Sequence, residues 1–130
     1  MDKAGKEKRR FERINVSFII TYKVDLPLTV RIKVGDKWFD SVALDLSEGG
    51  MAMLINHEFP VKTLVTVKFI LVNDKAILRI DRYRSMEVEA EVCYSVLVQG
   101  RSYRTGLCFV SITEEERTFI AHFVKGMLPA

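Results

Sequence analysis

Three arginines close to the N-terminus provide the first candidate chemistry in this sequence. They lie in the segment Lys8-Arg9-Arg10-Phe11-Glu12-Arg13. An arginine guanidinium is always charged, binds phosphate through paired hydrogen bonds, stacks on aromatic bases and recognises the O6/N7 edge of guanine. Arg9 and Arg13 are four positions apart, about 13 Å in an extended chain and roughly one turn of a helix. Either spacing lets the two side chains reach different parts of a dinucleotide.

A polar turn further along the chain is the second candidate site. It has the sequence Asp45-Leu46-Ser47-Glu48-Gly49-Gly50. The Asp45 carboxylate can accept hydrogen bonds from guanine N1–H and N2–H₂ or orient an arginine, and the Ser47 hydroxyl can donate to a phosphate oxygen. The adjacent glycines permit positive φ and a close approach of backbone to a ligand. The same residue types are also typical of an ordinary hairpin turn, so this turn alone does not identify a site.

The positive charge of the chain is concentrated at its N-terminus. The chain has 20 basic and 17 acidic residues, and residues 1–13 contain six of the basic and three of the acidic ones, which leaves 14 of each in residues 14–130. A basic arm on a neutral body predicts an anionic partner. Residues 1–7 are predicted to be a flexible tail, and the whole arm to be mobile without ligand.

The elements that position these two segments are predicted to be mainly strands. Apolar residues alternate with polar ones, which is typical of half-buried strands. Strands are predicted over 16–24, 28–34, 38–44, 51–55, 64–71, 77–83, 87–98 and 103–110. The second and third are predicted to form a hairpin around Gly35-Asp36. In 87–98, the side chains expected to face inward are those of Val88, Ala90, Val92, Tyr94 and Val96. Antiparallel strands at such short spacing predict a closed or nearly closed barrel.

A single helix is predicted at the C-terminal end. Thr113 and Glu116 have the spacing of a capping box. One apolar stripe then follows at helical spacing, formed by Phe119, Ile120, Phe123, Val124 and Met127. The stripe is expected to cover one barrel opening, and the alternative role is a helix that binds a partner.

Nothing in the sequence supports an enzyme, and no catalytic residue is predicted. The two histidines are His57, in a predicted loop, and His122, on the polar flank of the helix. The sequence has no HExxH, GxSxG, P-loop or GxGxxG motif. Glu87, Glu89 and Glu91 line one face of a strand, where solvated carboxylates are ordinary.

The cysteines and the hydropathy pattern indicate a cytoplasmic protein. Cys93 and Cys108 lie in apolar segments and are expected to be a buried, reduced pair. With no CxxC motif and no nearby histidine, they do not predict a metal site. The sequence also has no apolar run of about 18 residues, so no membrane span is predicted. Residues 1–6 lack the apolar region of a secretory signal.

Taken together, the two motifs resemble the paired signature of the PilZ domain family. Arg9-x-x-x-Arg13 is followed by Asp45-x-Ser47-x-x-Gly50, with Glu91-Val92 and Arg104-Thr105-Gly106-Leu107-Cys108-Phe109 in later strands. The resemblance covers about residues 8–125. It implies an all-β fold, a six- or seven-stranded antiparallel barrel with a short C-terminal α-helix, occupying residues 8–127. It also implies that the ligand is the bacterial second messenger cyclic di-GMP, with no cofactor and no metal.

The resemblance further implies roles for individual residues. Arg9 and Arg13 would contact phosphates and guanine, and Asp45, Ser47 and Gly50 would contact a guanine and help to close the pocket. The secondary candidates are Lys8, Arg10, Gly49 and Arg104. Lys8 directly precedes the arginine motif, where the resemblance implies an influence on ligand number, and its cationic side chain favours two ligands per protomer.

The function implied is that of a receptor and adaptor for an unidentified downstream protein. Ligand binding would order the arginine arm over the barrel, and the protein would be a monomer or weak homodimer that binds no DNA or RNA. One alternative is a protein-interaction module that has lost ligand binding. Another is a small nucleic-acid-binding barrel, which would carry basic and aromatic residues across its sheet.

Overall fold

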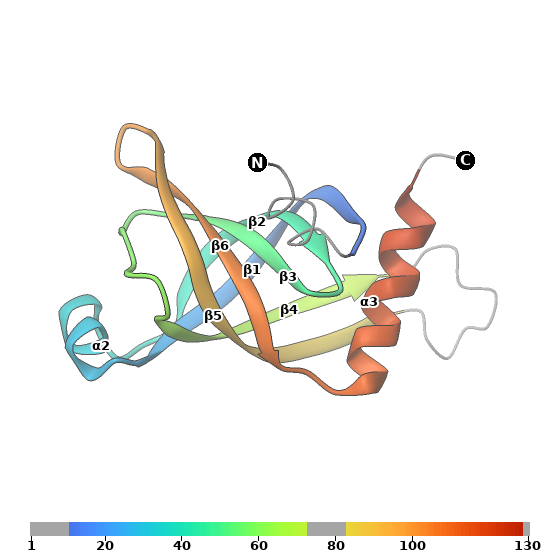
Figure 1. The fold of residues 1–130 in the computed structure, drawn as a ribbon, viewed down its shortest axis with the longest axis horizontal. Coiled ribbons are helices and arrows are strands. Elements are labelled where there is room, and N and C mark those ends of the chain that lie inside the picture. The colour runs from blue at the N-terminus through green and yellow to red at the C-terminus, as the bar shows by residue number, and fades with distance from the viewer. Residues whose placement is uncertain (1–10, 73–82, 129–130) are drawn as a thin grey trace, which may run out of the picture.

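The computed structural model describes residues 11–72 and 83–128, which form a closed six-stranded barrel with two helices (Figure 1). The elements in chain order are β1 Arg13–Leu26, α2 Leu28–Val34, β2 Phe39–Ser47, β3 Gly50–Ile55, β4 Leu64–Val72, β5 Tyr83–Gln99, β6 Ser102–Ser111 and α3 Glu114–Met127. The predicted all-β barrel with a C-terminal helix is therefore confirmed. Of the strand predicted over 77–83, only Tyr83 is described, and it begins β5.

The strands close into a ring in the order β1-β2-β3-β6-β5-β4, and every neighbouring pair is antiparallel. β1 pairs with β2 along its first part and with β4 along its second, so this one strand completes the ring. Within the ring, each strand therefore has a hydrogen-bonded neighbour on both sides.

Alternation along the strands fills the interior as predicted. In β1, the side chains of Ile20, Tyr22 and Val24 are buried in the core. In β5, Val88, Ala90 and Val92 face inward as expected. Tyr94 is only half-buried and contacts Arg104 instead, so the inward expectation is wrong for it, and Val96 is 52% exposed. The expectation for Val96 is wrong because the end of β5 and the start of β6 form a hairpin that projects beyond the barrel (Figure 1).

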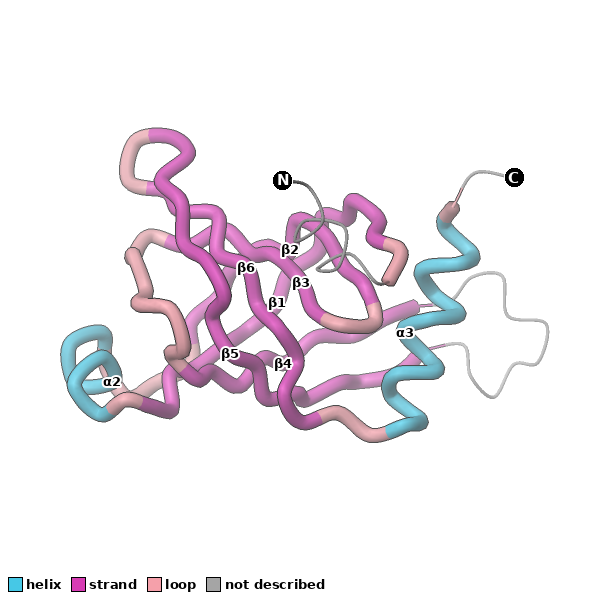
Figure 2. The backbone as a smooth tube through the Cα atoms, in the orientation of Figure 1, coloured by secondary structure: helices cyan, strands magenta, loops and turns pink. Residues whose placement is uncertain are grey.

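The segment predicted as a strand over 28–34 is the helix α2 instead (Figure 2). Val30 and Val34 are four residues apart on one helical face and pack against the core, while Leu28 and Ile32 are exposed. Over a segment of only seven residues, apolar residues at every second position fit both the two-residue period of a strand and the four-residue spacing of one helical face. The predicted hairpin does not form, and Gly35, at φ 112°, ends the helix as its C-cap.

The C-terminal helix α3 begins as predicted. The Thr113 hydroxyl accepts a hydrogen bond from the Glu116 N–H, and the Glu116 side chain accepts one from the Thr113 N–H. Phe119, Ile120 and Val124 are buried, and α3 lies across one end of the barrel (Figure 1). The predicted role of α3 as a cover is confirmed for these residues, although Met127 is 58% exposed.

The two cysteines lie on the outer surface of the barrel. Cys93 and Cys108 are both exposed, so the expectation of a buried pair is wrong. They occupy the outward positions of β5 and β6, next to Val92 and Leu107, whose side chains fill the core.

Within residues 11–72 and 83–128, no helix has the length and apolar character needed to cross a membrane.

Candidate ligand-binding site

A buried carboxylate on the outer wall of the barrel is the centre of the candidate site. The β2–β3 register shifts between Ala43 and Asp45, and Leu46 points into the core. Because neighbouring side chains of a strand point to opposite faces, Asp45 points outward. It is nevertheless only 2% exposed, since the side chains of Arg13 and Arg104 lie against it.

The two arginines hold the same oxygen of Asp45. Arg104 Nη2 donates to Asp45 Oδ2 over 2.5 Å, and Arg13 Nη1 lies 3.5 Å from that oxygen. Both arginine side chains are 37% exposed, so their outer sides face solvent. Asp45 Oδ1 is buried and has no hydrogen-bond partner among the described residues. A buried acceptor without a partner is costly, so a donor that reached this oxygen would stabilise the site.

Arg104 is positioned by a tyrosine of the next strand. Arg104 Nε donates to the Tyr94 hydroxyl over 3.2 Å, and this bond, followed by the charge of Asp45, raises the pKa of Arg104. The Tyr94 ring lies directly over Gly106, its partner in the β5–β6 register, where a Cβ atom would be 2.1 Å from the ring. The absence of a side chain at Gly106 thus creates the space for the ring.

The hydroxyl of Ser47 shapes the turn between β2 and β3. Ser47 is 3% exposed, and its Oγ accepts a hydrogen bond from the Gly49 N–H over 3.1 Å. The same Oγ lies 3.5 Å from the Gly50 carbonyl oxygen. In this structure Ser47 therefore binds the turn backbone, which fixes the ends of two site strands.

The two glycines of the turn serve close packing rather than positive φ. Among the described glycines, positive φ is found at Gly35 and Gly100 and not at Gly49 or Gly50, so the turn does not use the positive φ that its glycines permit. A Cβ on Gly50 would lie 1.9 Å from the Leu107 carbonyl oxygen, so Gly50 allows β3 to approach β6. A Cβ on Gly49 would lie 2.9 Å from the Phe11 ring.

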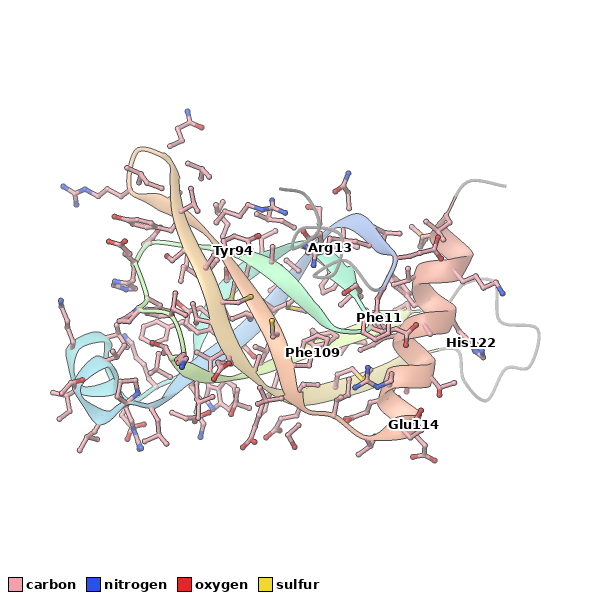
Figure 3. All side chains as sticks on the ribbon, viewed as in Figure 1. Phe11, Arg13, Tyr94, Phe109, Glu114 and His122 are labelled. Carbon is pink, nitrogen blue, oxygen red and sulfur yellow. The ribbon has the colours of Figure 1, made fainter. Side chains whose placement is uncertain are left out.

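Phe11 connects the N-terminal segment to both the turn and α3. Its ring lies against Gly49, and the Arg117 guanidinium of α3 lies 5.8 Å from the ring centroid. Figure 3 shows Phe11 beside α3, with Arg13 and Tyr94 along the same wall of the barrel. Arg13 is already the first residue of β1, paired with Ser47, which differs from the expectation that the arm is mobile through Arg13.

The structure thus brings most of the predicted site residues together. They are Arg13, Asp45, Ser47, Gly49, Gly50 and Arg104. Lys8, Arg9 and Arg10 lie outside the described residues. Sequence reasoning missed Tyr94 and Phe11 as members of the site. For Tyr94 the signal was an aromatic residue and a glycine, Gly106, on strands that pair with each other, which is a recognised combination in sheets.

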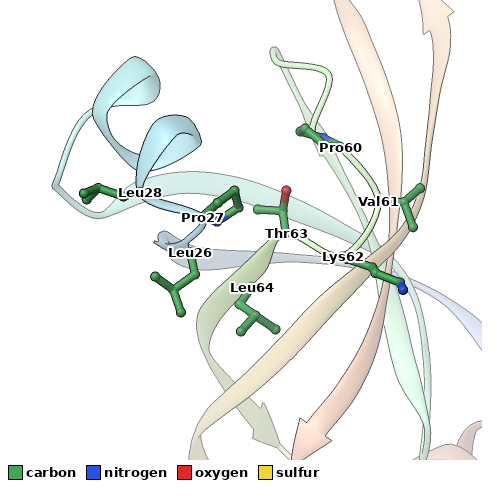
Figure 4. A pocket seen from close by; sticks show the side chains of 8 residues that line it. All are labelled: Leu26, Pro27, Leu28, Pro60, Val61, Lys62, Thr63 and Leu64. Carbon is green, nitrogen blue, oxygen red and sulfur yellow. The ribbon is translucent and has the colours of Figure 1, made fainter.

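The described residues also form an open pocket at the opposite end of β1 (Figure 4). Its lining is Leu26, Pro27, Leu28, Pro60, Val61, Lys62, Thr63 and Leu64. Lys62 is the single charged side chain in that lining, and none of the predicted site residues contributes to it. The cluster of cations and a free acceptor lies instead at the Asp45 wall, which suits an anion that also carries hydrogen-bond donors.

A comparison with known protein families identifies the family to which this chain belongs. The family described as "PilZ domain" matches residues 7–126, and the chain belongs to this family, which is a family of cyclic di-GMP receptors. A search of curated proteins found no match.

Three solved structures are similar in fold. The inhibitor of motility MotI/DgrA of Bacillus subtilis superposes with a TM-score of 0.69 at 12% identity, over 90% of this chain and 49% of that one, so this chain spans about half of that protein. The PilZ domain of YcgR from Escherichia coli, solved with c-di-GMP, gives 0.60 at 14% identity over 92% and 91% of the two chains. A tetrameric PilZ protein from Xanthomonas campestris gives 0.55 at 11% identity over 95% and 93%.

Proposed function

We propose that this chain is a receptor for cyclic di-GMP, which it binds on the outer barrel wall at Asp45. One observation carries the proposal: a buried carboxylate has one oxygen held by two arginines and the other without a partner among the described residues. Guanine has N1–H and N2–H₂ donors on one edge, and both suit a free carboxylate oxygen. The YcgR domain of similar fold was solved with the same ligand.

The two arginines are held unequally, and this gives them different roles. Arg104 is fixed by Asp45 at 2.5 Å and by Tyr94 at 3.2 Å. The 3.5 Å separation between Arg13 and Asp45 is longer than a normal hydrogen bond, so little energy is lost when Arg13 turns away. Arg13 therefore swings to a ligand phosphate, while Arg104 keeps the carboxylate in place.

Arg9 supplies the second guanidinium of the arginine motif. In the proposed mechanism, ligand binding orders residues 8–10 over the wall, because Arg9 and Arg13 then share the phosphates of one compact anion. Ordering costs roughly 1–2 kcal/mol for each residue fixed, so several charge-assisted contacts must offset it. Phe11, which already contacts the turn, provides the point from which the arm folds back.

The biological role that follows is that of an adaptor and not of an enzyme. The ordered arm and the neighbouring face of α3 form the surface that a downstream protein reads. We place the protein in the cytoplasm, as a monomer or weak homodimer without affinity for DNA or RNA, and without a cofactor or metal.

Isothermal titration calorimetry of the full chain tests the ligand. Cyclic di-GMP is expected to bind saturably, with GMP much weaker and single-stranded DNA showing no comparable binding. Because the contacts are ionic, affinity is also expected to fall with rising salt. Equal affinity for GMP and cyclic di-GMP contradicts a site built for a cyclic dinucleotide. Absence of binding supports the interaction-module alternative, and preference for DNA supports a nucleic-acid-binding barrel.

A further inference from the structure

Two exposed thiols lie side by side on the barrel wall. Cys93 of β5 and Cys108 of β6 are both exposed, and their Sγ atoms are 3.2 Å apart. The strands that carry them are paired along their length, with Glu91 opposite Cys108 and Tyr94 opposite Gly106. Both thiols therefore have fixed positions on a rigid sheet, and both are open to solvent.

The thiols are close to the geometry of a covalent bond. A disulfide joins its sulfur atoms at about 2.05 Å, so the present separation of 3.2 Å must shrink by only about 1.2 Å. Closing that gap takes rotation of the two side chains together with a small adjustment of the neighbouring strands that carry them. Metal binding is a poorer explanation of the pair, because the described residues contain no group of three or more His, Cys, Asp or Glu side chains that could hold an ion.

We propose that Cys93 and Cys108 are a reversible dithiol–disulfide site that reacts with low-molecular-weight disulfides. One thiol, as its thiolate, attacks the small disulfide, forms a mixed disulfide and releases one small thiol. The second thiolate then attacks the protein sulfur of that mixed disulfide and releases the second small thiol. In total, two protein thiols are oxidised to one disulfide, and one small disulfide is reduced to two small thiols.

The surroundings of Cys93 favour its neutral form. Desolvation by burial, followed by the interaction with Cys108, raises the pKa of Cys93 to about 12. Either thiol can make the first attack, and the reaction is expected to be faster at higher pH because the thiolate is the attacking form.

The pair also lies next to the proposed ligand site. Cys108 is opposite Gly50 in the β3–β6 register, and the Phe109 N–H donates to the Gly49 carbonyl over 2.9 Å. The charge of Arg13 is close enough to Cys93 to act on its pKa. Closing the disulfide pulls on the part of β6 that holds the turn, so oxidation is expected to weaken cyclic di-GMP binding. This consequence rests on the proposed function, whereas the dithiol does not.

The dithiol is tested by incubating the folded full chain with oxidised glutathione and measuring intact mass and free thiols. The wild type is expected to lose both thiols, with a mass lower by two hydrogen atoms and no retained glutathione. The matched variants Cys93→Ser and Cys108→Ser should each retain one glutathione. A wild type that keeps glutathione, forms a linked dimer or stays reduced while the single variants react overturns the proposal, as does failure of both variants to react.

The link to the ligand is tested separately by titrating cyclic di-GMP into the reduced and the oxidised protein. Oxidation is expected to lower affinity at least about threefold in the wild type and to have no such effect on the Cys93→Ser, Cys108→Ser double variant. Unchanged or tighter binding after oxidation overturns the link. If the reduced protein does not bind the ligand at all, the proposed function fails, and the mass measurements still decide whether the dithiol reacts.

Discussion

Replacing Gly50 by alanine is expected to damage the barrel itself, even though the motif suggests a ligand contact. The new Cβ atom would lie 1.9 Å from the carbonyl oxygen of Leu107 and 3.3 Å from the Cα atom of Cys108. These are backbone atoms of β6, directly opposite Gly50 in the ladder. A backbone atom within a paired strand cannot rotate away, so the two strands must separate.

The size of the effect follows from that separation. A Cβ atom is essentially never found within 3.0 Å of another heavy atom, so β3 must move away from β6 by at least about 1 Å. Overpacking of this kind costs typically 1–3 kcal/mol, and each backbone hydrogen bond that is stretched beyond reach costs about 1 kcal/mol more. We expect Gly50→Ala to lower the free energy of unfolding by about 2–4 kcal/mol and the melting temperature by roughly 10 °C.

Urea unfolding followed by tryptophan fluorescence and circular dichroism measures this change, with Gly49→Ala as the matched control. At Gly49 the nearest atom is Cδ2 of the Phe11 ring, at 2.9 Å, and a side chain can shift where a backbone cannot. The control should therefore lose less than about 1 kcal/mol. If Gly50→Ala is as stable as the control but binds cyclic di-GMP poorly, the packing argument is wrong and Gly50 acts through the ligand.

The remaining predictions concern the ligand, the tyrosine network and alkaline stability. Arg9→Ala and Arg13→Ala should each weaken cyclic di-GMP binding about 10- to 150-fold in calorimetry, with the exposed Arg101→Ala unchanged; wild-type affinity in both arm variants refutes the arm assignment. Saturation should occur at two ligands per protomer, and a one-to-one endpoint contradicts this. Tyr94→Phe removes the acceptor for Arg104 and should cost about 0.5–1.5 kcal/mol in urea unfolding, whereas undiminished stability would show that the bond is dispensable. Burial raises the pKa of Tyr22 to about 12 from 10.0, so its contribution to stability is present below pH 10 and is lost as the pH rises toward 12; Tyr22→Phe should flatten that loss.

The fold was predictable wherever one period of apolar residues was long enough to exclude another. The 14 residues of β1 alternate over several repeats, and Thr113 and Glu116 form a cap whose partners are local. α2 has seven residues, and its apolar pattern satisfies both a strand and a helix. β1 and β4 close the ring without this segment, and that closure is a property of the whole barrel and not of the seven residues.

The site was predictable as a set of residues but not as a network. The two motifs indicated that Arg13 and Asp45 act together, and the family resemblance pointed to Arg104 only through its neighbourhood. The contact of Tyr94 with Arg104 depends on the register shift after Val92, which no local pattern specifies. The exposure of the cysteines likewise depends on which face of β5 and β6 turns inward.

The carboxylate at the centre of the wall has a consequence for how the protein is made. Asp45 is paired by Arg104, which lies 59 residues later in the chain and belongs to the last strand of the barrel. During synthesis, β2 and β3 emerge from the ribosome long before β6, and until then Asp45 must remain hydrated. The wall is therefore assembled in the final folding steps, when non-local pairing closes the barrel. A nascent or half-folded chain lacks the Asp45–Arg104 pair, so the candidate site exists only in the completed barrel.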